Sequence, residues 1–205
     1  MNFTYCKHWA DKTLRVRVFI LLLAASVLLC GCISNILTGA SLIYERHSIY
    51  KSLSDFQLSA NASRALYHDE VFKCRQCAID LAVFNGDILL AGHVPSAKLR
   101  QEAQKRIAAL QGYRRLFNQL AIRRTDPNYI QDSWITAKIR AQILADARIN
   151  PKKFKVITAD RIVYLMGDVI PLQATLVIDI ARQCVGVKRV VKLLRYYNLS
   201  NHAIT

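Results

Sequence analysis

Acidic residues are scarce in this chain of 205 residues: 14 Asp and Glu stand against 29 Lys and Arg, giving a formal net charge of +15. A surplus of this size indicates an acidic partner, which is either nucleic acid, anionic lipid or an acidic protein. Charge alone does not distinguish these three classes. The compartment in which the chain works has to decide between them.

The sequence also lacks the motifs of a catalytic site. No Ser/His/Asp set, glycine-rich phosphate loop or pair of carboxylates stands out, and the five histidines are scattered along the chain. The Cys and His spacing does not assemble the ligand set that a metal centre needs. We therefore expect no catalytic residues, no cofactor and no metal.

An apolar run long enough to cross a membrane is missing as well. Residues 18–29 are uncharged, but twelve residues of helix span about 18 Å of a hydrocarbon core of about 30 Å. Basic residues precede this run and small residues follow it, which is typical of a secretory signal. The alternative is an uncleaved helical anchor. Residues 29–32, Leu-Cys-Gly-Cys, resemble a bacterial lipobox, in which Cys32 would be lipidated and become the new N-terminus.

This resemblance implies that residues 1–31 are a lipoprotein signal peptide and that Cys32 carries an acyl anchor such as palmitate. Ile33 follows Cys32, and the absence of an Asp there indicates sorting to the outer membrane, on its periplasmic face. A protein in that compartment rarely meets nucleic acid, whereas it always faces anionic phospholipid. The compartment thus favours lipid as the partner of the positive charge.

Two segments of the chain show the same order of patterns: a helix face, a hairpin, a second helix and a last strand. In the first segment the helix face is Leu58, Ala62 and Leu66, and the hairpin turns at Asn85-Gly86. A second helix starts near Ser96, a possible N-cap, and residues 113–122 form the last strand.

The second segment repeats this order from Asp132. Its helix face is Ile135, Ile139 and Ile143, and its hairpin joins residues 154–158 to 162–167. A helix over residues 172–183 and a strand over residues 188–196 follow. Equivalent positions are separated by nearly constant offsets: Leu58 and Ile135 by 77 residues, Gly92 and Gly167 by 75, and Gly112 and Gly186 by 74. The repeat predicts an α+β protein with two tandem αββαβ domains.

The motifs of the second segment resemble the BON domain family (bacterial OsmY and nodulation). They are the sequences at residues 134–140, 163–167 and 180–190, and residues 88–92 and 107–112 of the first segment carry the same signs. The resemblance covers residues 50–196. One departure is Asp168-Val-Ile-Pro171-Leu after the second glycine, where the family often has polar residues.

The resulting organisation has six parts. They are a signal peptide (1–31), a tether (32–51), a first BON domain (52–124), a linker (125–131), a second BON domain (132–197) and a C-terminal tail (198–205). Two BON domains behind a lipobox imply an outer-membrane lipoprotein without catalysis, which binds anionic phospholipid and supports membrane integrity. The alternative is a periplasmic adaptor that docks on an envelope assembly complex and uses its charge for solubility.

The family resemblance places the lipid contact mainly on the first helix of the second domain. On that helix Trp134, Ala137, Lys138, Ala141 and Leu144 share a face, because they recur at spacings of three and four. An apolar face beside cations is typical of a membrane interface. The predicted lipid-binding residues are Trp134, Lys138, Ile139, Arg140 and Leu144. The alternative is that Trp134 packs under the linker or against the first domain.

Two other features have weaker functional interpretations. Arg148, Lys152, Lys153 and Lys155 form a basic cluster that favours attraction to an anionic surface, unless it is only a solvated loop. Cys74 and Cys77 lie between a helix and a strand, where a thioredoxin-like site is not expected. We expect a loop there, with either a disulfide or free thiols.

Overall fold

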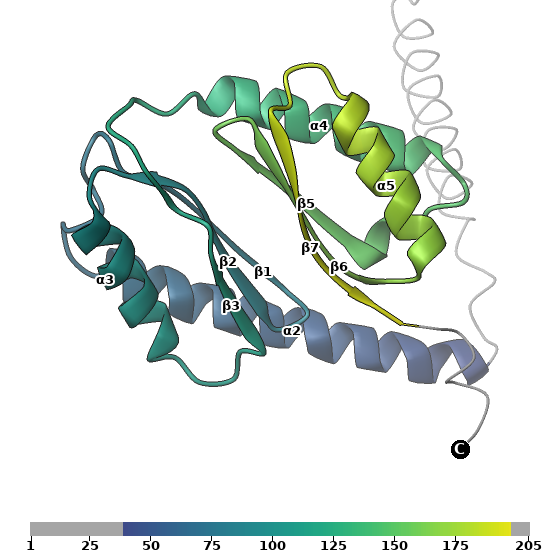
Figure 1. Ribbon diagram of the computed structural model, residues 1–205. Helices are drawn as coiled ribbons and strands as arrows, with labels where there is room; N and C mark the ends of the chain where they lie inside the picture. The colour runs from purple at the N-terminus through teal and green to yellow at the C-terminus, as the bar shows by residue number, and fades with distance from the viewer. Residues whose placement is uncertain (1–38, 198–205) are drawn as a thin grey trace, which may run out of the picture. The chain divides into compact units, whose positions relative to one another are not determined.

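The computed structural model describes residues 39–197, with side chains from residue 50 onward (Figure 1). The expected signal peptide, the lipidation site Cys32 and the tail 198–205 lie outside the described residues. The chain divides into two compact units, Met1–Arg46 and His47–Thr205. Both repeats lie within the second unit, and so does every buried residue named below.

The first repeat has the predicted order of elements. They are α2 (Gly39–Tyr67), β1 (Ala78–Phe84), β2 (Asp87–Val94), α3 (Ala97–Ala108), β3 (Arg115–Asn118) and β4 (Ala121–Ile122). β1 and β2 pair antiparallel, and β3 and β4 both pair parallel with β2. The single last strand that the sequence predicted is therefore two short strands, interrupted at residues 119–120.

The second repeat has the same topology. Its elements are α4 (Tyr129–Ala145), a 3₁₀ turn η1 (Pro151–Lys153), β5 (Phe154–Ala159), β6 (Ile162–Val169), α5 (Pro171–Gln183) and β7 (Arg189–Tyr196). β5 and β6 are antiparallel, and β7 runs parallel to β6. Pro171 occupies the first turn of α5. Backbone N–H groups in a first turn have no acceptor within the helix, so proline loses no helical hydrogen bond there. The two αββαβ units are thus confirmed.

Three boundaries differ from the prediction. α2 begins at Gly39, so helix occupies much of the expected tether over residues 32–51. α4 begins at Tyr129, where the Asn128 side chain caps the helix by accepting from the Gln131 N–H, so the linker is shorter than 125–131. α5 begins at Pro171, one residue before the predicted start. Gly112 and Gly186 both have positive φ, and each lies a few residues beyond the end of the helix that precedes it.

Both hairpins turn through two residues with positive φ, and an aspartate of the preceding helix holds each turn. Asn85 and Gly86 have φ of 50° and 78°, and Asp160 and Arg161 have φ of 54° and 64°. The Asp55 carboxylate accepts hydrogen bonds from the backbone N–H groups of Asn85 and Gly86. Asp132, 77 residues later, does the same for Asp160 and Arg161. The two bonds from Asp132 stabilise positive φ at Arg161, which is a backbone conformation that residues other than glycine rarely adopt.

Each repeat buries its own helix faces against one side of its sheet. Leu58, Ala62 and Leu66 of α2 pack with Ile88 and Leu90, which confirms the predicted face. In the second repeat the equivalent positions of α4 are packed in the same way against β5 and β6. They are Ile135, Ile139 and Ile143. The other faces of the two sheets carry a third buried cluster.

That third cluster joins the two repeats. It contains Ala82, Leu89 and Ala91 of the first sheet and Ala159, Tyr164, Met166 and Leu193 of the second. The two sheets lie between the helix pair α2 and α3 and the helix pair α4 and α5 (Figure 1). Since the central strands β2 and β6 face helices on one side and a sheet on the other, nearly all their residues are buried.

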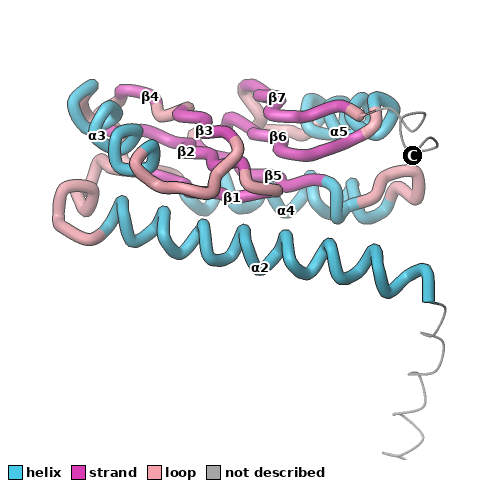
Figure 2. Tube along the Cα trace, turned by 90° about the horizontal axis from the view of Figure 1, so that it is seen from below, coloured by secondary structure: helices cyan, strands magenta, loops and turns pink. Residues whose placement is uncertain are grey.

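Equivalent polar contacts close the junction at both ends. Fully buried His93 lies 2.8 Å from Asp160 at the tip of the second hairpin. Asp168, which occupies the position of His93 in the second repeat, accepts a hydrogen bond from Asn85 at the tip of the first hairpin. Arg114 also bridges the repeats, 2.7 Å from Asp87 and 3.1 Å from Asp168. β1 and β5 consequently lie side by side (Figure 2), and this fixes α4 relative to the first sheet.

Candidate functional site

The outward face of α4 exposes large apolar side chains. Ile130 is 86% exposed, Trp134 57% and Leu144 70%, and they lie opposite the three buried isoleucines of the same helix. Ala137 and Ala141 fall between them at helical spacing and are also exposed. The helix is therefore apolar on two opposite faces. One face fills the core. The outer one, which we call the α4 stripe (Ile130, Trp134, Ala137, Ala141, Leu144), is left exposed by residues 39–197.

Cations border the α4 stripe on both sides. Lys138 lies over the indole of Trp134, with its Nζ 3.5 Å from the ring centroid, which is a close cation–π contact. Arg140 lies on the opposite flank and donates from Nη2 to the carbonyl of Val156 at 2.9 Å. One N–H of its guanidinium is used in this way, and a guanidinium has four further N–H donors.

The structure places most of the predicted residues together. Trp134 and Leu144 lie on the α4 stripe, with Lys138 and Arg140 at its borders, and Trp134 does not pack under the linker or against the first repeat. Ile139 is a correction. It is completely buried in the core of the second repeat, because it lies between Ile135 and Ile143 on the face turned to the sheet.

Two residues of this surface were missed by the sequence reasoning. Ile130 and Tyr129 belong to the first turn of α4, which the sequence analysis assigned to the linker. The signal was available, since Ile130 precedes Trp134 by four residues, and an Asn two residues before Ile130 is a frequent helix N-cap.

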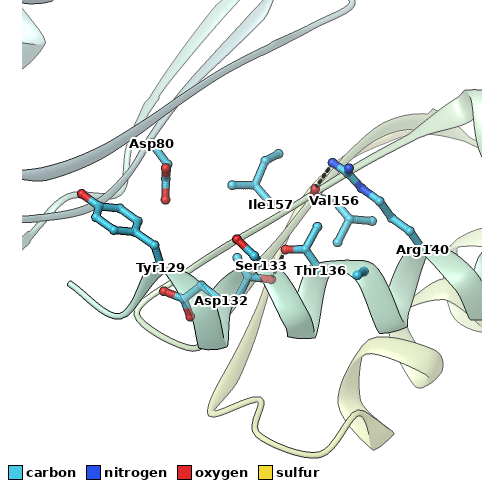
Figure 3. A pocket seen from close by; sticks show the side chains of 10 residues that line it. Asp80, Tyr129, Asp132, Ser133, Thr136, Arg140, Val156 and Ile157 are labelled. Atoms are coloured by element: carbon cyan, nitrogen blue, oxygen red, sulfur yellow. Dashed lines mark hydrogen bonds between the residues drawn. The ribbon is translucent and has the colours of Figure 1, made fainter.

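A cavity of about 290 Å³ lies beside α4, between that helix, β5 and β1 of the first repeat (Figure 3). Asp80 and Tyr129 lie at one end of it and Arg140 lies at the other (Figure 3). Ser133 and Thr136 present hydroxyl groups between the two ends. The cavity thus has an acidic and aromatic end, a polar middle and a basic end.

Asp80 is the unusual residue of this cavity. Its carboxylate forms no hydrogen bond or ion pair with any part of the chain that the structure describes. Burial raises the pKa of Asp80 to about 6, and the negative charges of Asp132 and Asp160 add to the effect. Those two neighbours are already engaged, because Asp132 holds the hairpin turn and Asp160 contacts His93. Asp80 is therefore a half-buried charge without a partner.

Two tyrosines near Asp80, Tyr129 and Tyr67, also have raised pKa values. Burial raises the pKa of Tyr129, and the charge of Asp80 raises it further. The pKa of Tyr67 is raised by burial first and by Asp80 second, while its hydroxyl donates to the carbonyl of Ile79. Both phenols are thus neutral groups beside an uncompensated carboxylate.

The basic cluster after α4 does not form one surface. Arg148 pairs with Asp146 at 2.7 Å, and Lys155 donates from Nζ to the carbonyl of Val83 in the first repeat at 3.0 Å. Burial lowers the pKa of Lys155. Lys153 lies over the ring of Tyr197. Lys155 therefore joins the repeats, and it is not part of a solvated loop.

Three cysteines lie within the residues that the structure describes. Cys74 and Cys77 form a disulfide with an S–S distance of 2.02 Å, in the loop between α2 and β1, so the disulfide alternative is the one observed. Cys184 is a free, buried thiol at the end of α5. Within residues 39–197 no group of three or more His, Cys, Asp or Glu side chains is arranged to hold a metal ion. No helix in that range is long and apolar enough to cross a membrane.

Two αββαβ units whose sheets share a buried junction define a class of small tandem-repeat α+β proteins. The model of the BON domain matches residues 55–124 and again residues 131–198, and this chain therefore belongs to the BON domain family. The matched segments contain both hairpins and every residue of the α4 stripe except Ile130.

The chain is also similar to several named proteins. The outer membrane lipoprotein DolP of Haemophilus influenzae is 26% identical, over 86% of this chain and 94% of its own. A 21 kDa hemolysin of Actinobacillus pleuropneumoniae is 30% identical, over 59% of this chain and 63% of its own. A structural protein of the type III secretion system of Chlamydia trachomatis shares 9% identity at a TM-score of 0.31, covering 71% of this chain and 95% of its own.

Proposed function

We propose that the chain is a lipid-anchored protein of the outer membrane that binds anionic phospholipid through the α4 stripe and thereby supports the integrity of that membrane. The lipobox-like residues 29–32 and the likeness to an outer membrane lipoprotein over nearly all of that relative's length support the location. Cys32 is the proposed site of lipidation. The protein has no catalytic role in this proposal.

The observation that carries the proposal is the stripe of Ile130, Trp134 and Leu144 with Lys138 and Arg140 at its borders. Fully burying each large apolar side chain contributes up to roughly 1.5–3 kcal/mol. Each cation near an anionic surface adds roughly 1 kcal/mol. Trp134 suits the headgroup layer, because its indole is apolar with one N–H that stays hydrated. Together these terms are sufficient for reversible attachment of an already tethered protein.

Co-sedimentation with vesicles tests the proposal. A soluble form of residues 33–205 retains every helix and strand that the structure describes and all three buried clusters. It should bind vesicles that contain phosphatidylglycerol, bind neutral vesicles poorly, and lose affinity as salt rises. Trp134→Glu should weaken binding at least tenfold, since it removes an apolar ring and adds a repelled charge.

Val185→Glu is the matched control. Val185 is 78% exposed in the same repeat, beyond the end of α5, and does not belong to the α4 stripe, so the same kind of substitution there should leave binding unchanged. If the wild-type form fails to bind anionic vesicles even at low salt, the lipid proposal is wrong and docking on an envelope protein takes its place.

A further inference from the structure

We propose that the cavity beside α4 binds the head of a short zwitterion, an ammonium group linked to a phosphate, with the ammonium at Asp80 and the phosphate at Arg140. The proposal rests on the lipid function and deepens it, because phosphatidylethanolamine carries this head. A soluble aminoalkyl phosphate has the same chemistry and is the other possible source.

The acidic end of the cavity is suited to an ammonium group. Asp80 belongs to β1, on the sheet face that turns toward the second repeat, because its neighbours Ile79 and Leu81 pack toward the helices. In Figure 3 its carboxylate and the ring of Tyr129 lie close together at the same end of the cavity. A carboxylate beside an aromatic ring attracts an ammonium through both its charge and the ring face.

The electrostatic situation of Asp80 supports this assignment. A half-buried carboxylate is normally paired, and the structure shows such pairing for Asp87, Asp160 and Asp168. Among the residues that the structure describes, Asp80 has no such cation, and burial together with the charges of Asp132 and Asp160 raises its pKa. A ligand that brings a positive charge removes this penalty, whereas an anion at the same end would increase it.

The other end of the cavity is suited to the phosphate. Arg140 lines it with donors that are not used in the bond to Val156, and Ser133 offers a hydroxyl donor between the two ends. A simple amine would leave Arg140 without a role, and a simple phosphate would leave Asp80 unpaired. A zwitterion satisfies both ends in the order in which Figure 3 displays them.

The cavity also lies where a lipid head would arrive. Ser133 and Arg140 flank the α4 stripe on the side toward β1, while Lys138 flanks it on the other side. A membrane that contacts Trp134 and Leu144 therefore presents its heads at the mouth of the cavity. The stripe accounts for attachment to an anionic surface, and the cavity adds a preference among the heads on that surface.

Two arms test the inference with residues 33–205. In the first arm, vesicles hold a constant fraction of phosphatidylglycerol, and the remainder is either phosphatidylethanolamine or phosphatidylcholine, whose methylated ammonium donates no hydrogen bond. The wild type should prefer the ethanolamine vesicles about three- to fivefold, as expected for a partly exposed ion pair. Asp80→Asn should abolish this preference and retain binding to both kinds of vesicle.

In the second arm, phosphoethanolamine is titrated into the protein while the carboxyl carbon of Asp80 is observed by NMR. Saturable binding should lower the pKa of Asp80 from about 6, because the ammonium stabilises the charged form. Asp179→Asn is the control, since it removes an exposed carboxylate of α5 that does not line the cavity and should change neither arm.

The outcomes separate the possibilities. An ethanolamine preference that depends on Asp80 supports the inference with lipid as the source. Saturable phosphoethanolamine binding without any vesicle preference supports it with a soluble source. Equal binding to both kinds of vesicle together with no effect of phosphoethanolamine on Asp80 overturns the inference and leaves the lipid function intact. Loss of the proposed function would show instead as no binding to either kind of vesicle.

Discussion

The first helices of the two repeats have the same inner face and different outer faces. With the offset of 77 residues, Leu58, Ala62 and Leu66 of α2 correspond to Ile135, Ile139 and Ile143 of α4, and all six are buried. On the outside the correspondence fails at the tryptophan and at the two cations. Trp134 corresponds to Gln57, Lys138 to Asn61 and Arg140 to Ser63.

This difference shows which part of the repeat is free to specialise. The inner face is constrained by packing, so both helices carry apolar residues there. Both helices also carry an aspartate, Asp55 in α2 and Asp132 in α4, because each carboxylate holds a strained hairpin turn. The outer face makes no contribution to the core, and only α4 combines a tryptophan with two flanking cations. We therefore assign the lipid contact to the second repeat.

The largest expected effect concerns the inner face. Ile139→Ala should lower the free energy of unfolding by about 2–5 kcal/mol, because it opens a cavity at a completely buried position. Urea denaturation measures this loss. Under conditions where the variant is still folded, its vesicle binding should equal that of the wild type. Reduced binding by a folded Ile139→Ala variant would show that the buried isoleucine acts in the contact after all.

The next effect concerns the outer face. The triple variant Trp134→Gln, Lys138→Asn and Arg140→Ser gives α4 the outer residues of α2. Removing two cations of roughly 1 kcal/mol each, together with the indole, should weaken binding to anionic vesicles by at least thirtyfold. Co-sedimentation over a range of lipid concentrations measures the change, and the melting temperature should remain within a few degrees of the wild type, since these side chains are outside the core. Retained affinity would place the contact elsewhere.

A smaller effect concerns pH and Asp80. The pKa of Asp80 is about 6 in the folded protein against an ordinary value of 3.8, so the charged form is disfavoured by folding. Its contribution to stability therefore falls as pH rises from about 4 to about 6 and stays low above that. Asp80→Asn should raise the free energy of unfolding by about 1–2 kcal/mol at pH 7 and by little at pH 4. An equal effect at both pH values would contradict the assigned environment of Asp80.

The smallest effect is a gain of function in the first repeat. Gln57→Trp, Asn61→Lys and Ser63→Arg, introduced together into the triple variant of α4, should restore a few-fold of the lost affinity. The restoration is partial, because each restored cation contributes only roughly 1 kcal/mol. Recovery to full wild-type affinity would mean that the neighbourhood of α4 adds nothing to the contact.

Much of the fold was predictable because it depends on short-range patterns. The buried faces of α2 and α4, the Asn85-Gly86 turn and the Ser96 cap all follow from residues close in sequence, and the structure confirms them. The sequence showed that Gly92 and Gly167 are equivalent, but it did not show why both positions need glycine. A Cβ at either position would collide with a carbonyl oxygen of the facing chain, of Ala78 and Lys153 respectively.

The rest depends on contacts between distant segments. Lys155 was read as part of a basic loop, although it donates to Val83, 72 residues away. Asp80 attracted no attention, because nothing near it in sequence indicates that α4 encloses it on one side. The junction pairs His93 with Asp160 and Arg114 with Asp168, which a single sequence does not connect. Ile139 was misplaced because the lipid-binding set combined two faces of one helix.

The central claim is that the α4 stripe enters the membrane interface, and the fluorescence of Trp134 tests it most directly. The chain has two tryptophans, at positions 9 and 134, so the form of residues 33–205 contains Trp134 alone. Because this ring is more than half exposed, its emission should lie at long wavelength in the free protein and shift to the blue when phosphatidylglycerol vesicles are added. Neutral vesicles should cause little shift. Emission that stays unchanged while the protein sediments with anionic vesicles would contradict the account.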